Sequence, residues 1–328
     1  MFCGTATEAN NLAVLGAAAA MERLGGAKPQ LIGSAAEHPA VLSPLRLLQQ
    51  RGFPLRTLPL DANARVDTDA LAAALDGRPA LLALQWANNE TGAVQALPAA
   101  LPDTTHFHCD SVQGWGKLPW DDRLDQAHSL VFSGHKFGAP KGIAALRLRS
   151  DAVLDAVLAG GGQQGGVRPG TESPALAAAF AHAMELAAAE RAEAAARWSA
   201  AARAFLEPVR AFFAAGGLPA DAALQENHTD EGLPNTLSLS FAGLDGRLLL
   251  PACDAEGLAV SSGSACSSGS ALPSPVLRAC GLDASLARAT IRVGFGGRQG
   301  VREGGDAGLR LVAVLGRLYQ VANRIDPH

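Results

Sequence analysis

Residues 129–142 read SLVFSGHKFGAPKG, and this stretch decides the predicted fold class. An apolar run of strand length leads into Ser133, His135 and Lys136, after which glycines and a proline break the chain. Similar runs in the first half of the sequence (QLIGS, ALLALQW, THFHCD, GIAALRLR) alternate with helix-like stretches such as VLSPLRLLQQRG. This alternation is typical of an α/β domain with a large, mostly parallel sheet.

The pattern of predicted helices and strands changes in the second half of the sequence. Ser173 is a good N-cap and Pro174 suits a first helical position, so we predict a long alanine-rich helix from Pro174 to about Ala215. Beyond it, short strand-like runs (NTLSLSF, LAVSS, TIRVGF) alternate with helical patches such as SPVLRACG. We therefore predict a large α/β domain over residues 1–190 and a smaller C-terminal α+β domain over residues 191–328.

Composition excludes several classes of function. The formal net charge is −4 and no run of basic residues appears, which argues against a nucleic-acid partner. The five cysteines are scattered without a CxxC pair, which indicates reduced thiols in a cytoplasmic protein and no metal site. No apolar stretch reaches the ~20 residues of a membrane span, and the N-terminus has no secretory pattern, so we expect no membrane association.

Four polar clusters directly follow predicted strands: Glu37 and His38, residues 88–92 (NNETG), residues 110–113 (DSVQ) and residues 133–136 (SGHK). Ligands of open α/β sheets bind outside the carboxyl ends of the strands. We therefore expect the four clusters to meet in one crevice.

The residue types in these clusters fit pyridoxal 5'-phosphate. A lysine amine can form a Schiff base with the cofactor's aldehyde, and an aspartate can hold the pyridine nitrogen protonated. The stretch TATEANNLAVLG, residues 5–16, offers amides and hydroxyls for the phosphate at the start of a predicted helix, with Ser133 and His135 as further donors. The alternative for TATE is a plain capping box that only starts a helix.

A resemblance becomes specific when the motifs are taken together. ATEANN, the EH pair at Glu37, NNETG, DSVQGWGK, SGHKFGAPKG, GGGQQGGVRPGT, SSGSACSSGS and TIRVGF follow one another between about Thr5 and Arg298. In this order and spacing they resemble the class V aminotransferases, pyridoxal-phosphate enzymes of fold type I, and within them the cysteine desulfurases that supply sulfur for iron-sulfur cluster assembly. The same resemblance implies that an N-terminal segment of the family is absent ahead of Thr5.

The resemblance implies a role for each matching residue around the cofactor. Lys136 would be the Schiff-base lysine and remove the substrate's α-proton, and Asp110 would pair with the pyridine nitrogen. Gln113 would donate to the phenolic oxygen, His38 would stack on the ring as a second acid-base candidate, and Asn89 would lie close to cofactor or substrate.

The resemblance also implies which residues bind the cofactor's phosphate and the substrate. The phosphate would be held by Ala6, Thr7, Ser133 and His135. Thr171 would reach the phosphate of the neighbouring subunit, which implies a homodimer. Arg292 would bind the carboxylate of the substrate, L-cysteine, through paired donors.

Cys266 decides between activities. It lies in the glycine- and serine-rich stretch SSGSACSSGS, which predicts a mobile loop. The resemblance implies that its thiolate takes sulfur from L-cysteine as a persulfide, releases L-alanine and passes the sulfur to an acceptor or iron-sulfur scaffold protein. The alternatives are a buried filler cysteine, a truncated inactive paralogue that only binds cofactor or a partner subunit, and a related aminotransferase or selenocysteine lyase.

Overall fold

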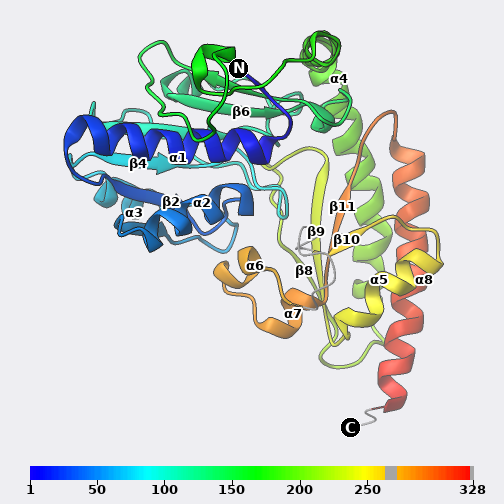
Figure 1. Cartoon of the computed structure of the whole chain (residues 1–328). Helices are drawn as coiled ribbons and strands as arrows, with labels where there is room; N and C mark the ends of the chain where they lie inside the picture. Colours follow the sequence, from blue (N-terminus) through cyan, green and yellow to red (C-terminus); the bar gives the residue numbers. More distant parts are fainter. Residues whose placement is uncertain (263–271, 326–328) are drawn as a thin grey trace. The chain divides into compact units, whose positions relative to one another are not determined.

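The computed structural model describes residues 1–262 and 272–325 (Figure 1). The chain divides into two compact units. The first comprises residues 1–60, 65–88 and 94–191, and the second comprises residues 61–64, 89–93 and 192–328. The sequence predicts one unbroken domain over residues 1–190, whereas two short segments of that range group with the second unit.

The first unit is built on a seven-stranded sheet with the strand order β1-β7-β6-β5-β4-β2-β3. Strands β3, β2, β4, β5 and β6 pair in parallel, and β7 is antiparallel to both β6 and β1. This largely parallel sheet confirms the predicted fold class. The strands are β1 (Phe2–Cys3), β2 (Gln30–Ser34), β3 (Leu55–Leu58), β4 (Ala80–Ala83), β5 (Thr105–Asp110), β6 (Ser129–Ser133) and β7 (Ala144–Leu148).

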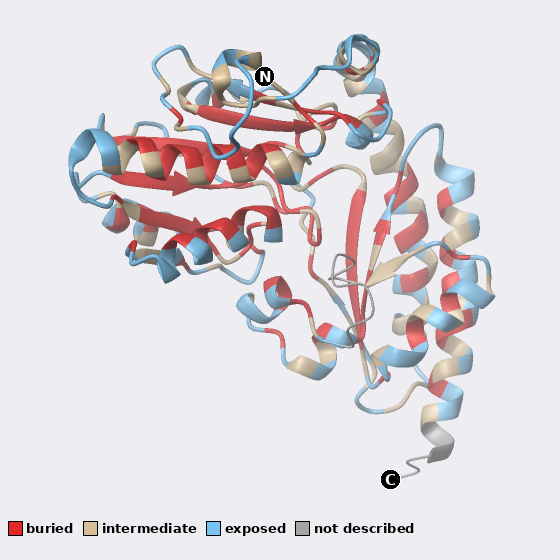
Figure 2. Ribbon diagram, viewed as in Figure 1, coloured by how far each residue is buried: buried red, intermediate tan, exposed pale blue. Residues whose placement is uncertain are grey.

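Helices cover this sheet because their apolar faces need partners. Helix α1 (Ala6–Gly25) buries Leu12, Val14 and a row of alanines, and Figure 2 shows its buried residues on the side that lies along the strands. Helices α2 (Pro39–Gln50) and α3 (Thr68–Ala74) follow β2 and β3 in the chain. Short 3-10 helices are η1 (Asp122–Gln126), η2 (Gly134–Lys136) and η3 (Gln163–Gly166).

The second unit contains a four-stranded antiparallel sheet with the order β10-β11-β9-β8. The core on this sheet includes Phe205, Phe241 and Leu311, and Tyr319 Oη donates a 2.6 Å hydrogen bond to the carbonyl of Ala242. The strands are β8 (Ala223–Glu226), β9 (Thr236–Ala242), β10 (Ser261–Ser262) and β11 (Thr290–Gly294). The helices are α4 (Pro174–Ala214), α5 (Gly246–Ala255), α6 (Pro275–Ala279), α7 (Ala284–Arg288) and α8 (Val301–Ile325), and α4 begins within the first unit.

The register of the first sheet gathers several strand ends at one edge. Gly33 of β2 pairs with Ala83 of β4, and Asp110 of β5 pairs with Val131 of β6. Because these strands are parallel, the segments that follow them all leave from the same edge. The candidate site of the first unit lies there. No helix within the described residues has the length and hydropathy that would let it cross a membrane.

Candidate active site

Lys136 and Asp110 follow neighbouring strands of the sheet. Asp110 is the last residue of β5, and Lys136 ends the 3-10 helix η2 that continues β6. The carboxyl of Asp110 lies in the interior, with the residue 7% exposed, whereas Lys136 is exposed. An exposed lysine therefore follows β6, and the neighbouring strand β5 ends in a buried carboxyl.

His38 completes an electrostatic group with these two residues. It is the N-cap of α2, and its Nδ1 accepts a 3.1 Å hydrogen bond from Ala40 N, so a neutral ring carries its proton on Nε2. Burial lowers the pKa of His38, the charge of Asp110 raises it, and the charge of Lys136 lowers it again. Asp110 and Lys136 thus both affect the pKa of His38.

Asp110 is held by two donors within the first unit. Val112 N donates to Oδ1 over 3.1 Å and Asn10 Nδ2 donates to Oδ2 over 2.8 Å. Burial raises the pKa of Asp110, whereas these two hydrogen bonds and the charges of His38 and Lys136 lower it. Asn10 was not predicted as a site residue, although it belongs to the motif ATEANN at the start of α1.

The turn after Asp110 is shaped by a close approach of backbone to an aromatic ring. Gln113 Oε1 accepts a 2.6 Å hydrogen bond from Lys117 Nζ. Gly114 lies against the buried ring of Trp86, where a Cβ atom would overlap the ring. A glycine is therefore required directly after Gln113.

The expected phosphate donors lie at the starts of two helical segments. Ser133 Oγ and His135 Nδ1 are 3.0 Å apart, and burial together with Lys136 and Lys141 lowers the pKa of His135. Ala6 and Thr7 are the first two residues of α1, and Thr7 is exposed. Their backbone N–H groups belong to the orphan donors of a helix N-terminus.

The start of α1 also has the capping interactions that the alternative for TATE predicts. Thr5 Oγ1 accepts a 3.1 Å hydrogen bond from Glu8 N, and Glu8 Oε2 accepts one of 2.7 Å from Gly4 N. Arg168 Nε donates to Glu8 Oε1 over 2.7 Å. A cap and a phosphate-binding turn use different N–H groups, so the capping interactions leave the predicted role of Ala6 and Thr7 open.

Glu37 supports the turn that presents His38. Its Oε1 accepts hydrogen bonds of 2.9 Å from Ser34 Oγ and from Gln85 N, and its buried Oε2 has no hydrogen-bond partner among the described residues. Burial raises the pKa of Glu37 to about 8, and the charge of Asp110 adds to this effect. Burial therefore favours the protonated form of the Glu37 carboxyl at neutral pH.

The second unit holds the predicted substrate-binding arginine. Arg292 on β11 donates from Nη1 to the carbonyl of Asn89 over 2.8 Å. The adjacent Glu90 is buried and accepts a short hydrogen bond from Ser274, the N-cap of α6. Burial raises the pKa of Glu90 to about 7, against the opposing effects of Ser274 and Arg292. Glu90 is thus a titratable neighbour of Arg292, and the sequence had included it only as a member of the polar cluster at residues 88–92.

The described residues do not test the predicted roles of Cys266 and Thr171. Cys266 lies outside the described residues. Thr171 is exposed and lies between η3 and α4 in the first unit. Their predicted roles as sulfur carrier and as donor to a neighbouring subunit stay predictions.

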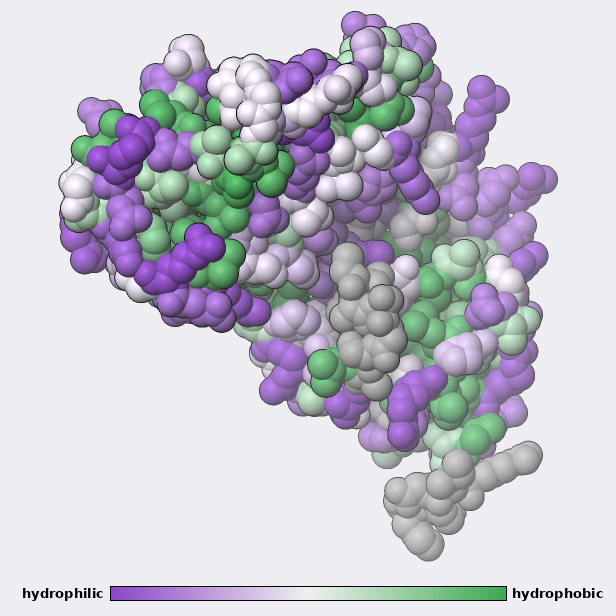
Figure 3. All heavy atoms as spheres, viewed as in Figure 1, coloured by the Kyte–Doolittle hydropathy of each residue, from purple (hydrophilic) through white to green (hydrophobic). Residues whose placement is uncertain are grey.

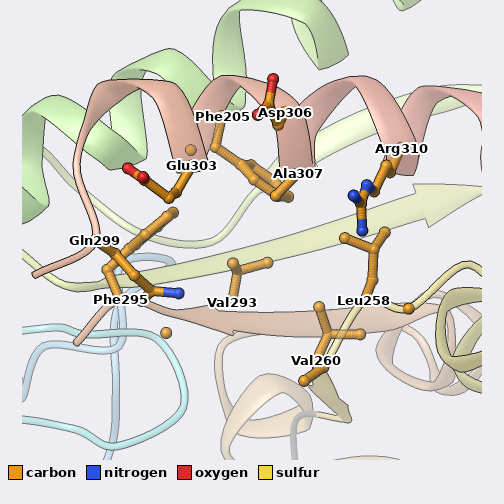
Figure 4. Close-up of a pocket in the computed structure, with 14 residues that line it drawn as sticks. Phe205, Leu258, Val260, Val293, Phe295, Gln299, Glu303, Asp306, Ala307 and Arg310 are labelled. Carbon is orange, nitrogen blue, oxygen red and sulfur yellow. The ribbon is translucent and has the colours of Figure 1, made fainter. Parts of the chain in front are cut away.

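A pocket of about 340 Å³ lies within the second unit (Figure 4). Leu258, Val260 and Val293 line one side, and α8 contributes polar side chains that include Glu303 and Arg310. Figure 3 shows hydrophobic residues gathered on the same unit, between the elements that Figure 1 labels β10 and α5. The lining contains none of the predicted site residues that the structure describes.

The largely parallel sheet of the first unit and the antiparallel sheet of the second are the architecture of fold-type I enzymes. The family described as aminotransferase class-V matches residues 1–300. The chain belongs to this family. The match confirms the resemblance carried by the sequence motifs.

Known relatives bear more specific names. A protein named cysteine desulfurase from Gluconacetobacter diazotrophicus is 36% identical over 298 residues, which are 88% of this chain and 71% of the relative. Cysteine desulfurase NifS from Azotobacter vinelandii is 34% identical over 300 residues, covering 89% of this chain and 71% of the relative.

Solved structures of other proteins share the fold of this chain. A protein titled NifS-like superposes with a TM-score of 0.85 at 27% identity, over 97% of this chain and 82% of that chain. The structure of DndA from Streptomyces lividans superposes with a TM-score of 0.72 at 32% identity, over 90% of this chain and 82% of that chain.

Proposed function

We propose that this protein is a pyridoxal-phosphate-dependent cysteine desulfurase. It converts L-cysteine to L-alanine, keeps the sulfur as a persulfide on Cys266 and passes it to an acceptor, such as a scaffold protein for iron-sulfur clusters. The observation that carries the proposal is the placement of Asp110 and Lys136 after the neighbouring parallel strands β5 and β6, with His38 at the N-cap of the helix that follows β2. The names of the relatives supply the reaction.

The residues at the sheet edge fit pyridoxal phosphate. A buried carboxyl with a donor on each oxygen suits a protonated ring nitrogen, and an exposed lysine suits an aldehyde. Asp110, Gln113, His38 and Lys136 would hold the ring, and Ala6, Thr7, Ser133 and His135 the phosphate. When bound, the cofactor supplies a sink for the electrons left on the substrate's α-carbon.

The chain's own residues bind the substrate and move its protons. Lys136 Nζ is the base that removes the α-proton, because an exposed amine can reach a bound amino acid. Arg292 orients the substrate carboxylate with paired donors. It also donates to the carbonyl of Asn89, so Asn89 lies beside the guanidinium group. Burial lowers the pKa of His38, which favours the neutral ring that would stack on the cofactor.

Sulfur transfer balances without an external oxidant. The Sγ thiolate of Cys266 attacks the sulfur of the substrate, the bond between that sulfur and the substrate's β-carbon breaks, and a proton is added to the carbon. The products are L-alanine and a persulfide on Cys266. We further propose that the enzyme works as a homodimer in the cytoplasm, with Thr171 of one subunit donating to the phosphate bound by the other.

Reconstitution with pyridoxal phosphate tests the cofactor. We expect a visible absorption band and, after borohydride reduction, a mass adduct on Lys136. Lys136→Ala should lack both. A wild-type chain that gains neither would refute the cofactor assignment and support an inactive paralogue.

Sulfide release from L-cysteine tests the reaction. With a thiol reductant present, wild type should release sulfide, and Cys266→Ser should release none while keeping the absorption band. A Cys266→Ser variant that retains wild-type turnover of an amino acid would instead identify an aminotransferase. Cys280→Ser is the matched control, because Cys280 is a described, half-buried thiol of the same unit.

A further inference from the structure

We propose that Asn10 is a positioning residue for Asp110, at the end of a buried chain of hydrogen bonds that runs from Ser129 through His108. The inference rests on the proposed cofactor site and deepens it. It assigns a task to three residues that have no direct role in the proposed reaction.

The chain of hydrogen bonds crosses three elements of the first unit. Asn10 on α1 donates from Nδ2 to Asp110 Oδ2 over 2.8 Å. Its Oδ1 lies 2.9 Å from His108 Nε2 on β5, and His108 Nδ1 lies 2.8 Å from Ser129 Oγ on β6. Asn10 is 1% exposed, and His108 and Ser129 are fully buried.

The direction of each hydrogen bond follows from the carboxylate. An ionised Asp110 only accepts, so Asn10 must present its amide nitrogen to Asp110 and its carbonyl oxygen to His108. His108 Nε2 must then carry the ring proton, and Nδ1 must accept from the Ser129 hydroxyl. One arrangement of protons satisfies all three contacts, which fixes the orientation of the Asn10 amide.

His108 acts here as a neutral anchor and not as a proton exchanger. Burial lowers its pKa to about 3, so the ring stays uncharged over the pH range in which an enzyme works. The chain therefore supplies a fixed dipole to Asp110 without adding a charge. Because the hydrogen bond from Asn10 opposes the effect of burial on the Asp110 pKa, it favours the ionised carboxylate that a protonated ring nitrogen requires.

The test compares four variants with wild type after reconstitution with pyridoxal phosphate. Asn10→Ala removes the donor to Asp110. His108→Phe keeps a ring but loses the donor to Asn10, whereas His108→Gln retains a neutral N–H group. Asn11→Ala is the matched control, because Asn11 lies next to Asn10 on α1 and its amide donates to the carbonyl of Thr7.

The readouts are the cofactor dissociation constant and the pH midpoint of the visible band. A hydrogen bond to a charged group contributes enough for Asn10→Ala to weaken cofactor binding by about tenfold or more. The midpoint should rise by about one pH unit. A protonated ring nitrogen opposes, through its positive charge, the protonation of the nitrogen at Lys136, and this opposition weakens when the ring nitrogen loses its proton. His108→Phe should change in the same direction, and His108→Gln and Asn11→Ala should stay close to wild type.

The outcomes separate this inference from the proposed function. A wild-type chain without a visible band refutes the proposed cofactor site. A normal wild-type band with an unchanged midpoint and affinity in Asn10→Ala overturns the positioning role. If circular dichroism shows that Asn10→Ala is unfolded, the pair at His108 decides, and equal midpoints in His108→Phe and His108→Gln overturn the role as well.

Discussion

Arg168 Nε lies 2.7 Å from Glu8 Oε1, although the two residues are 160 positions apart in the chain. Glu8 occupies the first turn of α1, where Ala6 and Thr7 are the proposed phosphate donors. An unpaired carboxylate at that place would repel a phosphate dianion. Arg168 therefore neutralises the charge of Glu8 beside the proposed phosphate-binding turn.

We expect Arg168→Ala to weaken the binding of pyridoxal phosphate by about fivefold, in keeping with the ~1 kcal/mol that a partly exposed charge pair contributes. Equilibrium dialysis of the cofactor measures the effect. The double change Arg168→Ala with Glu8→Gln should recover most of the affinity, because the unpaired charge is then gone. Arg23→Ala is the control, since Arg23 pairs with Asp155 near the other end of α1. A double variant as weak as Arg168→Ala would contradict the charge explanation.

Gly114→Ala should destabilise the first unit. The added methyl group would overlap the buried ring of Trp86, and overpacking of a core commonly costs about 1–3 kcal/mol. The free energy of unfolding in urea measures this loss. Gly25→Ala should leave stability unchanged or slightly higher, because a Cβ at Gly25 meets no atom within 4 Å. Equal stabilities of the two variants would show that the turn after Gln113 can relax.

Glu37 should make stability decrease as the pH rises. Its pKa is about 8 in the folded chain against an ordinary 4.5, so between these values the folded state holds a proton that the unfolded state lacks. Each pH unit crossed then lowers the free energy of unfolding by at most about 1.4 kcal/mol. We expect the difference between Glu37→Gln and wild type to grow in favour of the variant from pH 5.5 to 8. Urea unfolding at both pH values measures it, and a constant difference would place the Glu37 pKa outside this window.

Glu90 should make substrate binding depend on pH. Above its pKa of about 7 the Glu90 carboxylate would compete for the positive charge of Arg292 with the substrate carboxylate that we propose Arg292 binds. We expect the ratio of the wild-type KM for L-cysteine to that of Glu90→Gln to rise about threefold from pH 6 to 8, with little change in the ratio of kcat values. Glu256→Gln, which alters a surface pair with Arg317, should keep a constant ratio. A pH-independent ratio for Glu90→Gln would remove Glu90 from the control of Arg292.

The sequence correctly predicted the local features. Apolar runs that end in polar residues gave β2, β5 and β6, and the Ser173 and Pro174 pair gave the start of α4. Hydrophobic period and capping depend on residues close in the chain, so a pattern of a few positions suffices to predict them. The short strand β3 is not among the runs that the pattern singled out, and segments 61–64 and 89–93 group with the second unit against the predicted boundary.

The sequence by itself determined the family, the largely parallel sheet and the residues that carry the proposed chemistry, because each is written in short motifs. Only the tertiary structure decided which side chains support them: Asn10 on Asp110, Arg168 on Glu8 and Trp86 on Gly114. Such pairs join residues far apart in the chain, and a hydrogen bond or a close packing contact forms only where the fold brings two atoms to within a few ångströms. Hydrophobic periodicity indicates whether a side chain is buried, whereas the packing of helix against sheet decides which residue it contacts.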